Sequence, residues 1–81
     1  IFDYISLSPD YSIYEIATPR EWEGKTVMEL ALRQRYRLNV LGVKKGKDLQ
    51  PMPGPSHRFQ AGESVLVLGH DKDVQSLLRG K

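Results

Sequence analysis

Residues 65–68, Val-Leu-Val-Leu, constrain the fold more than any other stretch of this chain. All four residues are apolar and Val65 and Val67 are β-branched, which favours a β-strand with no polar side chain on either face. A strand of this kind is typical of a position that is covered on both sides. We therefore expect it in the interior of a sheet, with helices on one face and a second subunit on the other.

Other segments with high β-propensity lie between turn residues. Residues 11–18 form one such segment, which Pro19 ends, and residues 38–43 form another. Residues 1–7 are consistent with a further strand or an extended linker. The last strand is expected at residues 64–68.

A lysine-rich segment follows residues 38–43. Residues 44–48, Lys-Lys-Gly-Lys-Asp, predict a hairpin turn with Gly46 at a positive φ, and residues 49–52 predict a short return strand. Pro51 cannot donate a backbone hydrogen bond to a neighbouring strand, so the return strand should lie at an edge of the sheet.

Two helices are expected. Thr26 and Glu29 fit the capping-box pattern, which predicts a helix over residues 26–36. Its apolar stripe consists of Val27, Leu30 and Ala31, widened by Met28 and Leu32. Asp71 is the expected N-cap of a second helix that ends at Gly80. The order (β)-β-α-β-β-β-α predicts an α+β fold, a small, mostly antiparallel sheet with two helices packed on it, in a dimer.

Size and composition indicate one small globular domain. The chain has 81 residues, of which 40% are apolar and 27% are charged. It has no cysteine, which excludes disulfides and fits a reducing compartment. No apolar run approaches the roughly 20 residues of a membrane-spanning helix. Because the chain opens at Ile1 rather than Met, we expect residues 1–81 to be one domain excised from a longer protein.

Basic residues gather in the middle of the chain. Residues 33–47 hold six of the twelve Lys and Arg residues and no acid. One interpretation is a solvated helix end, where cations complement the helix dipole, followed by a lysine-rich turn. The alternative is a site for phosphates, in the extreme case a small nucleic-acid-binding domain. Only Tyr36 accompanies these charges, which is unlike the interleaved aromatics of single-stranded nucleic-acid binders.

No motif for catalysis, metal binding or nucleotide binding is present. His57 and His70 have no third partner at metal-ligand spacing, and there is no HExxH, GxSxG, P-loop or GxGxxG. We therefore expect a protein that is not an enzyme and has no resident cofactor or metal within this domain.

Four stretches in order nonetheless resemble a known family. They are DYISLSPDYSIYEI (3–16), GKTVMEL (24–30), RLNVLGVKKG (37–46) and FQAGESVLVLG (59–69). Together they resemble the C-terminal RCK domain, or TrkA-C domain, of Ktr-type regulatory subunits of bacterial potassium transporters. The resemblance covers nearly the whole chain and agrees with the order of strands and helices derived above.

The resemblance implies a regulatory role. Such domains follow a nucleotide-binding Rossmann-type domain, form homodimers, and belong to rings that lie in the cytoplasm at the inner face of the membrane. Their partner is a potassium-translocating membrane subunit. In many members, cyclic di-AMP binds in a cleft between two subunits and lowers potassium uptake. Some RCK domains are purely structural dimerisation modules, and this alternative stays open.

The resemblance also implies contacts with the dinucleotide. The residues concerned are Asn39, Val40, Leu41, Lys44, Lys45, His57 and Arg58. Val40 and Leu41 would contact the adenine faces, and the two lysines would face phosphates across the two-fold axis. The structural alternatives are sheet or dimer packing for Val40 and Leu41, and a strand-start hydrogen bond for Asn39. For His57 the alternative is an ordinary exposed loop residue.

Overall fold

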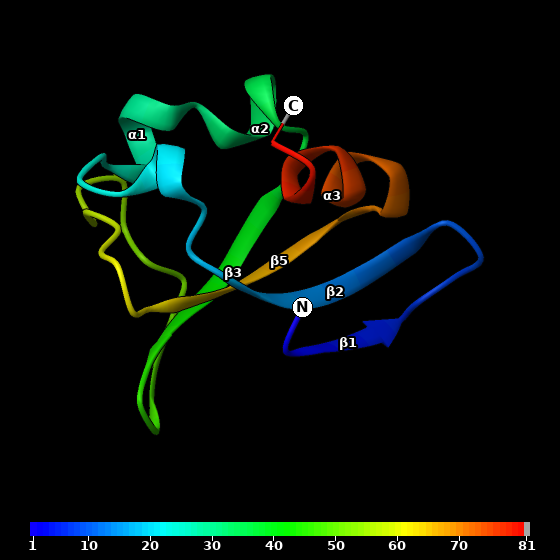
Figure 1. The fold of residues 1–81 in the computed structure, drawn as a ribbon, viewed down its shortest axis with the longest axis horizontal. Helices are drawn as coiled ribbons and strands as arrows, with labels where there is room; N and C mark the ends of the chain where they lie inside the picture. Colours follow the sequence, from blue (N-terminus) through cyan, green and yellow to red (C-terminus); the bar gives the residue numbers. More distant parts are fainter. Residues whose placement is uncertain (81) are drawn as a thin grey trace.

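The computed structural model describes residues 1–80, which form a five-stranded antiparallel sheet in the order β1-β2-β5-β3-β4 (Figure 1). The strands are β1 (Asp3–Ser6), β2 (Tyr11–Ala17), β3 (Asn39–Lys45), β4 (Asp48–Pro51) and β5 (Ser64–His70). The strand that contains residues 65–68 is therefore central, as predicted. Pro51 lies in edge strand β4, and Gly46 has φ +62° in the hairpin turn, which confirms both predictions.

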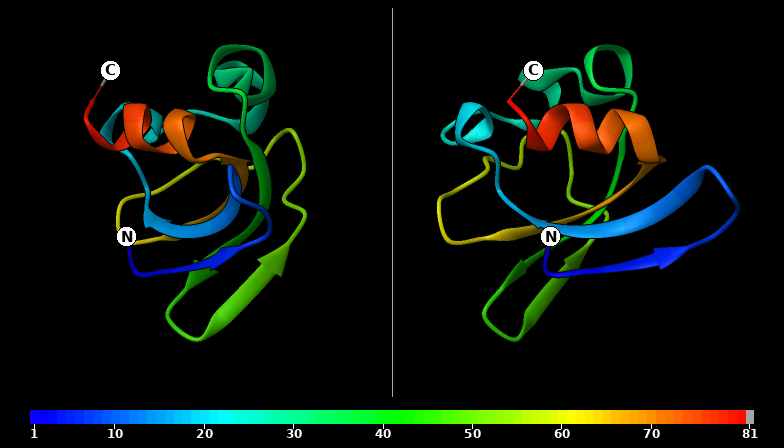
Figure 2. Two further views of the ribbon diagram at one scale, coloured as in Figure 1. Left: turned by 90° about the vertical axis from the view of Figure 1, so that its right-hand side faces the viewer. Right: turned by 45° about the vertical axis from the view of Figure 1, so that its right-hand side comes forward.

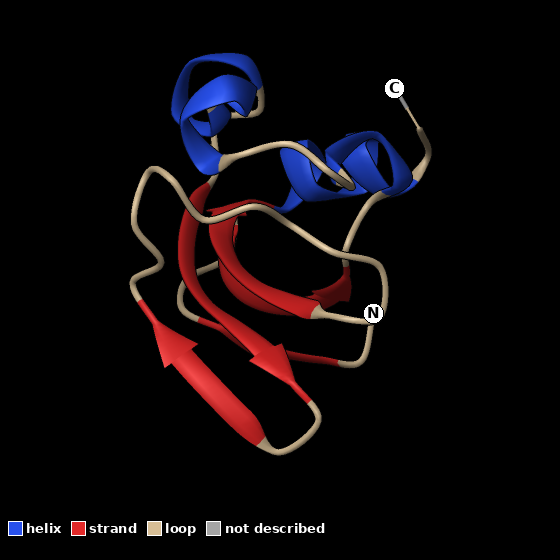
Figure 3. Ribbon diagram, turned by 90° about the vertical axis from the view of Figure 1, so that its left-hand side faces the viewer, coloured by secondary structure: helices blue, strands red, loops and turns tan. Residues whose placement is uncertain are grey.

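The α-helices lie on one side of the sheet, and the β3–β4 hairpin projects away from them (Figures 2 and 3). They are α1 (Val27–Leu30), α2 (Leu32–Arg35) and α3 (Asp71–Leu78), and a 3₁₀ turn, η1 (Arg20–Trp22), precedes them. This arrangement confirms the α+β class. No helix within residues 1–80 is long and apolar enough to cross a membrane.

The helix expected over residues 26–36 is in fact two short helices. Its start is correct, because Thr26 and Glu29 form both hydrogen bonds of the capping box. Ala31, however, has φ +48° and ψ +54°, which separates α1 from α2. In an unbroken helix, residues two apart point in different directions. The left-handed turn at Ala31 lets both Leu30 and Leu32 enter the core, where they are buried.

The start of the last helix also differs from the prediction. His70, not Asp71, is the N-cap of α3, and its Nδ1 atom accepts a hydrogen bond from the backbone N–H of Lys72. Asp71 is the first helical residue, and its carboxylate accepts a hydrogen bond from the Tyr14 hydroxyl at 2.9 Å. That bond ties the start of α3 to β2.

The core lies between the sheet and the helices. Trp22 and Phe59 are fully buried, with ring centroids 5.3 Å apart. The other buried apolar residues are Tyr14, Ile16, Leu30, Leu32, Leu38, Val43, Val65, Val67, Val74 and Leu77. Members of this set come from every strand except the edge strands β1 and β4, so edge strands add little to the core.

The opposite face of the sheet carries a cluster of apolar residues beside the acidic residues Asp3 and Glu15. Cross-strand pairing places Ile5 beside Ile13, and Ile13 beside Leu68. Leu66 and Leu68 are half-buried, whereas Val65 and Val67 on the helix side are fully buried. The central strand is thus covered on one face within a single chain, and its other face is partly open.

Candidate ligand-binding site

A hollow of about 450 Å³ lies between α1, α2, the start of β3 and the loop after β4. Its volume falls within the range of small-molecule sites. The lining residues are Val27, Met28, Ala31, Leu32, Arg33, Gln34, Leu38, Asn39, Val40 and Pro53. Seven of these ten are apolar, and Arg33, Gln34 and Asn39 add polar groups.

Backbone hydrogen bonds fix the two walls of the hollow. The N–H groups of Val27 and Met28 donate to the carbonyl oxygens of His57 and Pro55, each at 3.0 Å. The first residues of α1 are therefore held by the loop that also carries Pro53. A four-residue helix has little stability of its own, so this contact determines where α1 lies.

Three residues with left-handed backbone conformation border the hollow. Ala31 lines it, Arg37 precedes the lining residue Leu38, and Met52 precedes Pro53. Their φ angles are +48°, +59° and +48°, although none of them is glycine. Such conformations cost about 1–3 kcal/mol each and concentrate at ligand-binding sites. The backbone around this hollow is thus left-handed at three non-glycine positions.

A β-bulge shapes the wall that β3 contributes. Val40 pairs with Val67 and Gly42 pairs with Leu66, so Leu41 is an extra residue between them. Its carbonyl oxygen accepts a hydrogen bond from the N–H of Met52 at 3.0 Å. The bulge therefore anchors the loop that leads to Pro53.

The hollow contains two of the seven residues implied by the family resemblance. Asn39 and Val40 line it, with Asn39 exposed and Val40 half-buried against the core. Leu41 follows them in the bulge but is not among the lining residues.

The two lysines lie toward the other end of β3. Lys44 is five residues beyond Asn39, which corresponds to about 17 Å along a strand. Its Nζ atom is 3.6 Å from Oε2 of Glu15, and it lines a second hollow of about 470 Å³. Lys45 is exposed at the end of the strand. Within one chain, the hollow between α1 and β3 does not include them.

His57 and Arg58 contact protein groups instead of lining the hollow. The Nε2 atom of His57 is 3.5 Å from Oε1 of the buried Glu63, and its ring packs edge-on against Phe59. Arg58 donates a hydrogen bond to the carbonyl oxygen of Gly24.

Reasoning from the sequence missed several lining residues, among them Val27, Met28 and Arg33. The apolar stripe predicts that Val27 and Met28 face the core, yet Met28 is 68% exposed. Arg33 belongs to the basic run of residues 33–47, which was the available signal. The break at Ala31, which places these residues beside Asn39, has no marker in the sequence.

One charged group beside α1 has a shifted pKa. The hydrogen bond from the backbone N–H of Thr26 lowers the pKa of the Glu29 carboxyl, and the Thr26 side chain and the nearby Arg58 lower it further. Glu29 is therefore an anion at neutral pH. No group of three or more potential metal ligands occurs among residues 1–80.

Comparisons with known proteins agree with this architecture. Ktr system potassium uptake protein A of Bacillus subtilis (strain 168) is 29% identical over 75 residues, which are 93% of this chain. The chain spans only about a third of that relative, 34% of its length.

Solved structures are also similar. The RCK C domain of the potassium transport protein KtrA, in complex with cyclic di-AMP, superimposes with a TM-score of 0.79 at 25% identity, covering 88% of this chain and 84% of that one. The RCK_C domain dimer of S. agalactiae BusR, also in complex with cyclic di-AMP, gives 0.69 at 23% identity, covering 84% and 91%. The model of the TrkA-C domain family matches residues 11–79. This chain therefore belongs to the TrkA-C domain family.

Proposed function

We propose that this domain is a regulatory module of a potassium-uptake system and that two copies bind cyclic di-AMP between them. One observation carries the proposal. The chain has a mostly apolar hollow, bordered by Arg33 and Asn39, and its fold matches a KtrA domain that was solved with this dinucleotide. The role is binding, not catalysis.

The chemistry of the hollow suits one half of cyclic di-AMP, an adenosine with its phosphate. Val27, Met28 and Val40 offer apolar surface for the faces of an adenine. The amide of Asn39 has both a donor and an acceptor for the edge of that base. The guanidinium of Arg33, which is exposed at the rim, is the group of choice for a phosphate.

The symmetry of the ligand favours a homodimer. Cyclic di-AMP has two equivalent halves, and a two-fold interface presents the same hollow twice. Met28 and Met52 are 68% and 81% exposed, and they would give such an interface apolar surface to bury. Binding changes the geometry of a ring only if the ligand has a higher affinity for one dimer geometry than for another.

The proposal extends to the full-length protein. By analogy with the Ktr relative, whose matched region is about a third of its length, the complete chain would act in the cytoplasm beneath a potassium-translocating membrane subunit. Cyclic di-AMP bound to this domain would then lower potassium uptake through that subunit.

Isothermal titration calorimetry tests the ligand. We expect saturable heat with one cyclic di-AMP per two chains, and a loss of binding in Val40→Asp. Because Val40 packs partly against the core, the companion variant is Met28→Asp, at an exposed lining residue. The matched control is Leu49→Asp, since Leu49 is 54% exposed on β4 and does not line the hollow. The absence of both heat and a thermal shift at hundreds of micromolar ligand would contradict the proposal.

The alternatives predict other outcomes. A purely structural module would dimerise without binding the dinucleotide. A nucleic-acid-binding domain would bind many oligonucleotides with a steep salt dependence. Lys44, one of the six basic residues of 33–47, lies 3.6 Å from Glu15, which reduces the positive charge offered to a nucleic acid.

A further inference from the structure

The loop after β4 runs antiparallel to the segment that leads into α1. Four backbone hydrogen bonds of 2.9–3.0 Å join residues 24–28 to residues 55–59. The N–H of Gly24 donates to the carbonyl oxygen of Phe59, and the N–H of Phe59 donates to that of Lys25. The N–H groups of Val27 and Met28 donate to the carbonyl oxygens of His57 and Pro55. Thr26 and Arg58 face each other as an isolated β-bridge in the middle of this stretch.

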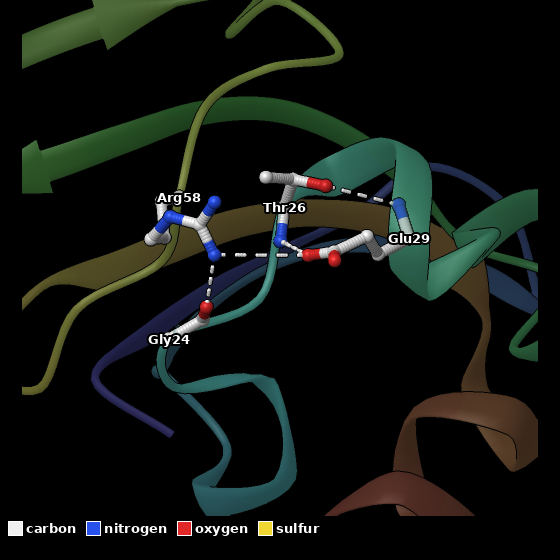
Figure 4. Close-up of polar contacts among 4 residues, drawn as sticks. All are labelled: Gly24, Thr26, Glu29 and Arg58. Carbon is white, nitrogen blue, oxygen red and sulfur yellow. Dashed lines mark hydrogen bonds and ion pairs between the residues drawn. The ribbon is translucent and has the colours of Figure 1, made fainter.

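Arg58 crosses from this loop to the cap of α1 (Figure 4). Its Nη1 atom donates to the carbonyl oxygen of Gly24 and lies 3.8 Å from Oε1 of Glu29. The same Oε1 atom accepts the backbone N–H of Thr26 at 2.8 Å. One carboxylate oxygen thus contacts both the arginine of the loop and the cap of the helix.

We infer that Arg58 and Glu29 form a positioning pair that sets the width of the hollow. Val27 and Met28 lie on one wall, Pro53 lies on the other, and neither member of the pair lines the hollow. The pair joins the elements that carry these walls. The inference rests on the proposed function, because it assigns the pair a role in holding the adenine site ready for the dinucleotide.

Positioning and direct contact predict opposite effects for one variant. If Arg58 instead bound a phosphate of the ligand, Glu29 would compete for its guanidinium, and Glu29→Gln would leave binding unchanged or tighten it. If Arg58 acts through Glu29, the same variant weakens binding. Glutamine still completes a capping box, so Glu29→Gln removes the charge contact while α1 keeps its cap.

Calorimetry with cyclic di-AMP on the wild type and four variants separates these cases. Arg58→Ala and Glu29→Gln should each weaken binding by about two- to fivefold, the effect expected when an exposed ion pair is lost. The double variant should be no weaker than the weaker single variant. Arg79→Ala, at an exposed arginine after α3, is the control and should bind like the wild type. Unchanged or tighter binding by Glu29→Gln, or fully multiplicative losses in the double variant, would overturn the inference.

A second measurement needs no ligand. In Arg58→Ala, the amides of Val27 and Met28 should exchange with water several-fold faster by NMR, because their acceptors lie on the loop that has been released. The amides of Val65 and Val67 in the central strand should be unchanged. Unaltered exchange at Val27 and Met28 would refute the positioning role. If the wild type did not bind cyclic di-AMP, the proposed function would fail, and exchange alone would decide whether the pair fixes α1.

Discussion

Gly69 is the position at which one added methyl group should affect the core and the hollow together. It is a buried residue of β5, and a Cβ atom built on it would overlap with Cδ2 of Leu38. Leu38 is fully buried, packs in the core, and lines the hollow. The backbone at Gly69 is not in the left-handed region, so Gly69→Ala perturbs the packing and not the chain conformation.

The expected magnitude follows from overpacking. Forcing an extra carbon into a filled core costs about 1–3 kcal/mol. In a domain of this size, 1 kcal/mol shifts Tm by about 4–8 °C, so a loss of about 2 kcal/mol lowers Tm by about 8–16 °C. Gly54→Ala is the control, because nothing lies within 4 Å of a Cβ atom there and the backbone is not left-handed. That variant should melt like the wild type.

Urea unfolding followed by the fluorescence of Trp22, the only tryptophan, measures the free energy directly. Valine lacks δ carbons, so Leu38→Val should remove the overlap. The double variant Gly69→Ala with Leu38→Val is then expected to be as stable as Leu38→Val alone. A Gly69→Ala domain within about 0.5 kcal/mol of the wild type would refute the packing argument, since that is the range of inconsequential surface changes.

Three further predictions concern single side chains. Burial and the hydrogen bond to Asp71 raise the pKa of Tyr14. The contribution of this residue to stability is therefore present below pH 10 and is lost as pH rises through the raised pKa. Tyr14→Phe should lower the free energy of unfolding by about 1 kcal/mol at pH 7, and it should flatten the alkaline limb of the curve of stability against pH. The pKa of Glu29 is lowered from 4.5, so its contribution to stability is present above that pH and is lost as pH falls through the lowered value. Glu29→Gln should flatten the acid limb of the curve of stability against pH, measured by urea unfolding at a series of pH values. Ala31→Gly should raise the unfolding free energy by about 1 kcal/mol, because glycine adopts φ +48° without strain, and chemical unfolding that shows a loss would contradict this.

Local patterns account for most of the fold. Thr26 and Glu29 predicted the capping box, Gly46 the hairpin turn, and Pro51 an edge strand, because each of these residues acts through its own backbone or its near neighbours. The apolar run of residues 65–68 predicted the central strand for the same reason.

The candidate site depends on features that such patterns do not contain. The left-handed turn at Ala31 follows from burying both Leu30 and Leu32, and the bulge at Leu41 follows from pairing with β5. Both are consequences of tertiary packing. The positioning role of Arg58 also depends on tertiary structure, because its partner Glu29 lies 29 positions away in the chain.

A crystal structure of the domain grown with cyclic di-AMP tests the central claim most directly. We predict one dinucleotide between two copies, with an adenine beside Met28 and Val40 in each hollow and a phosphate near Arg33. Electron density for the ligand in the second hollow beside Lys44 and Glu15, or bound to a single copy outside the hollow of α1, α2 and β3, would contradict the account.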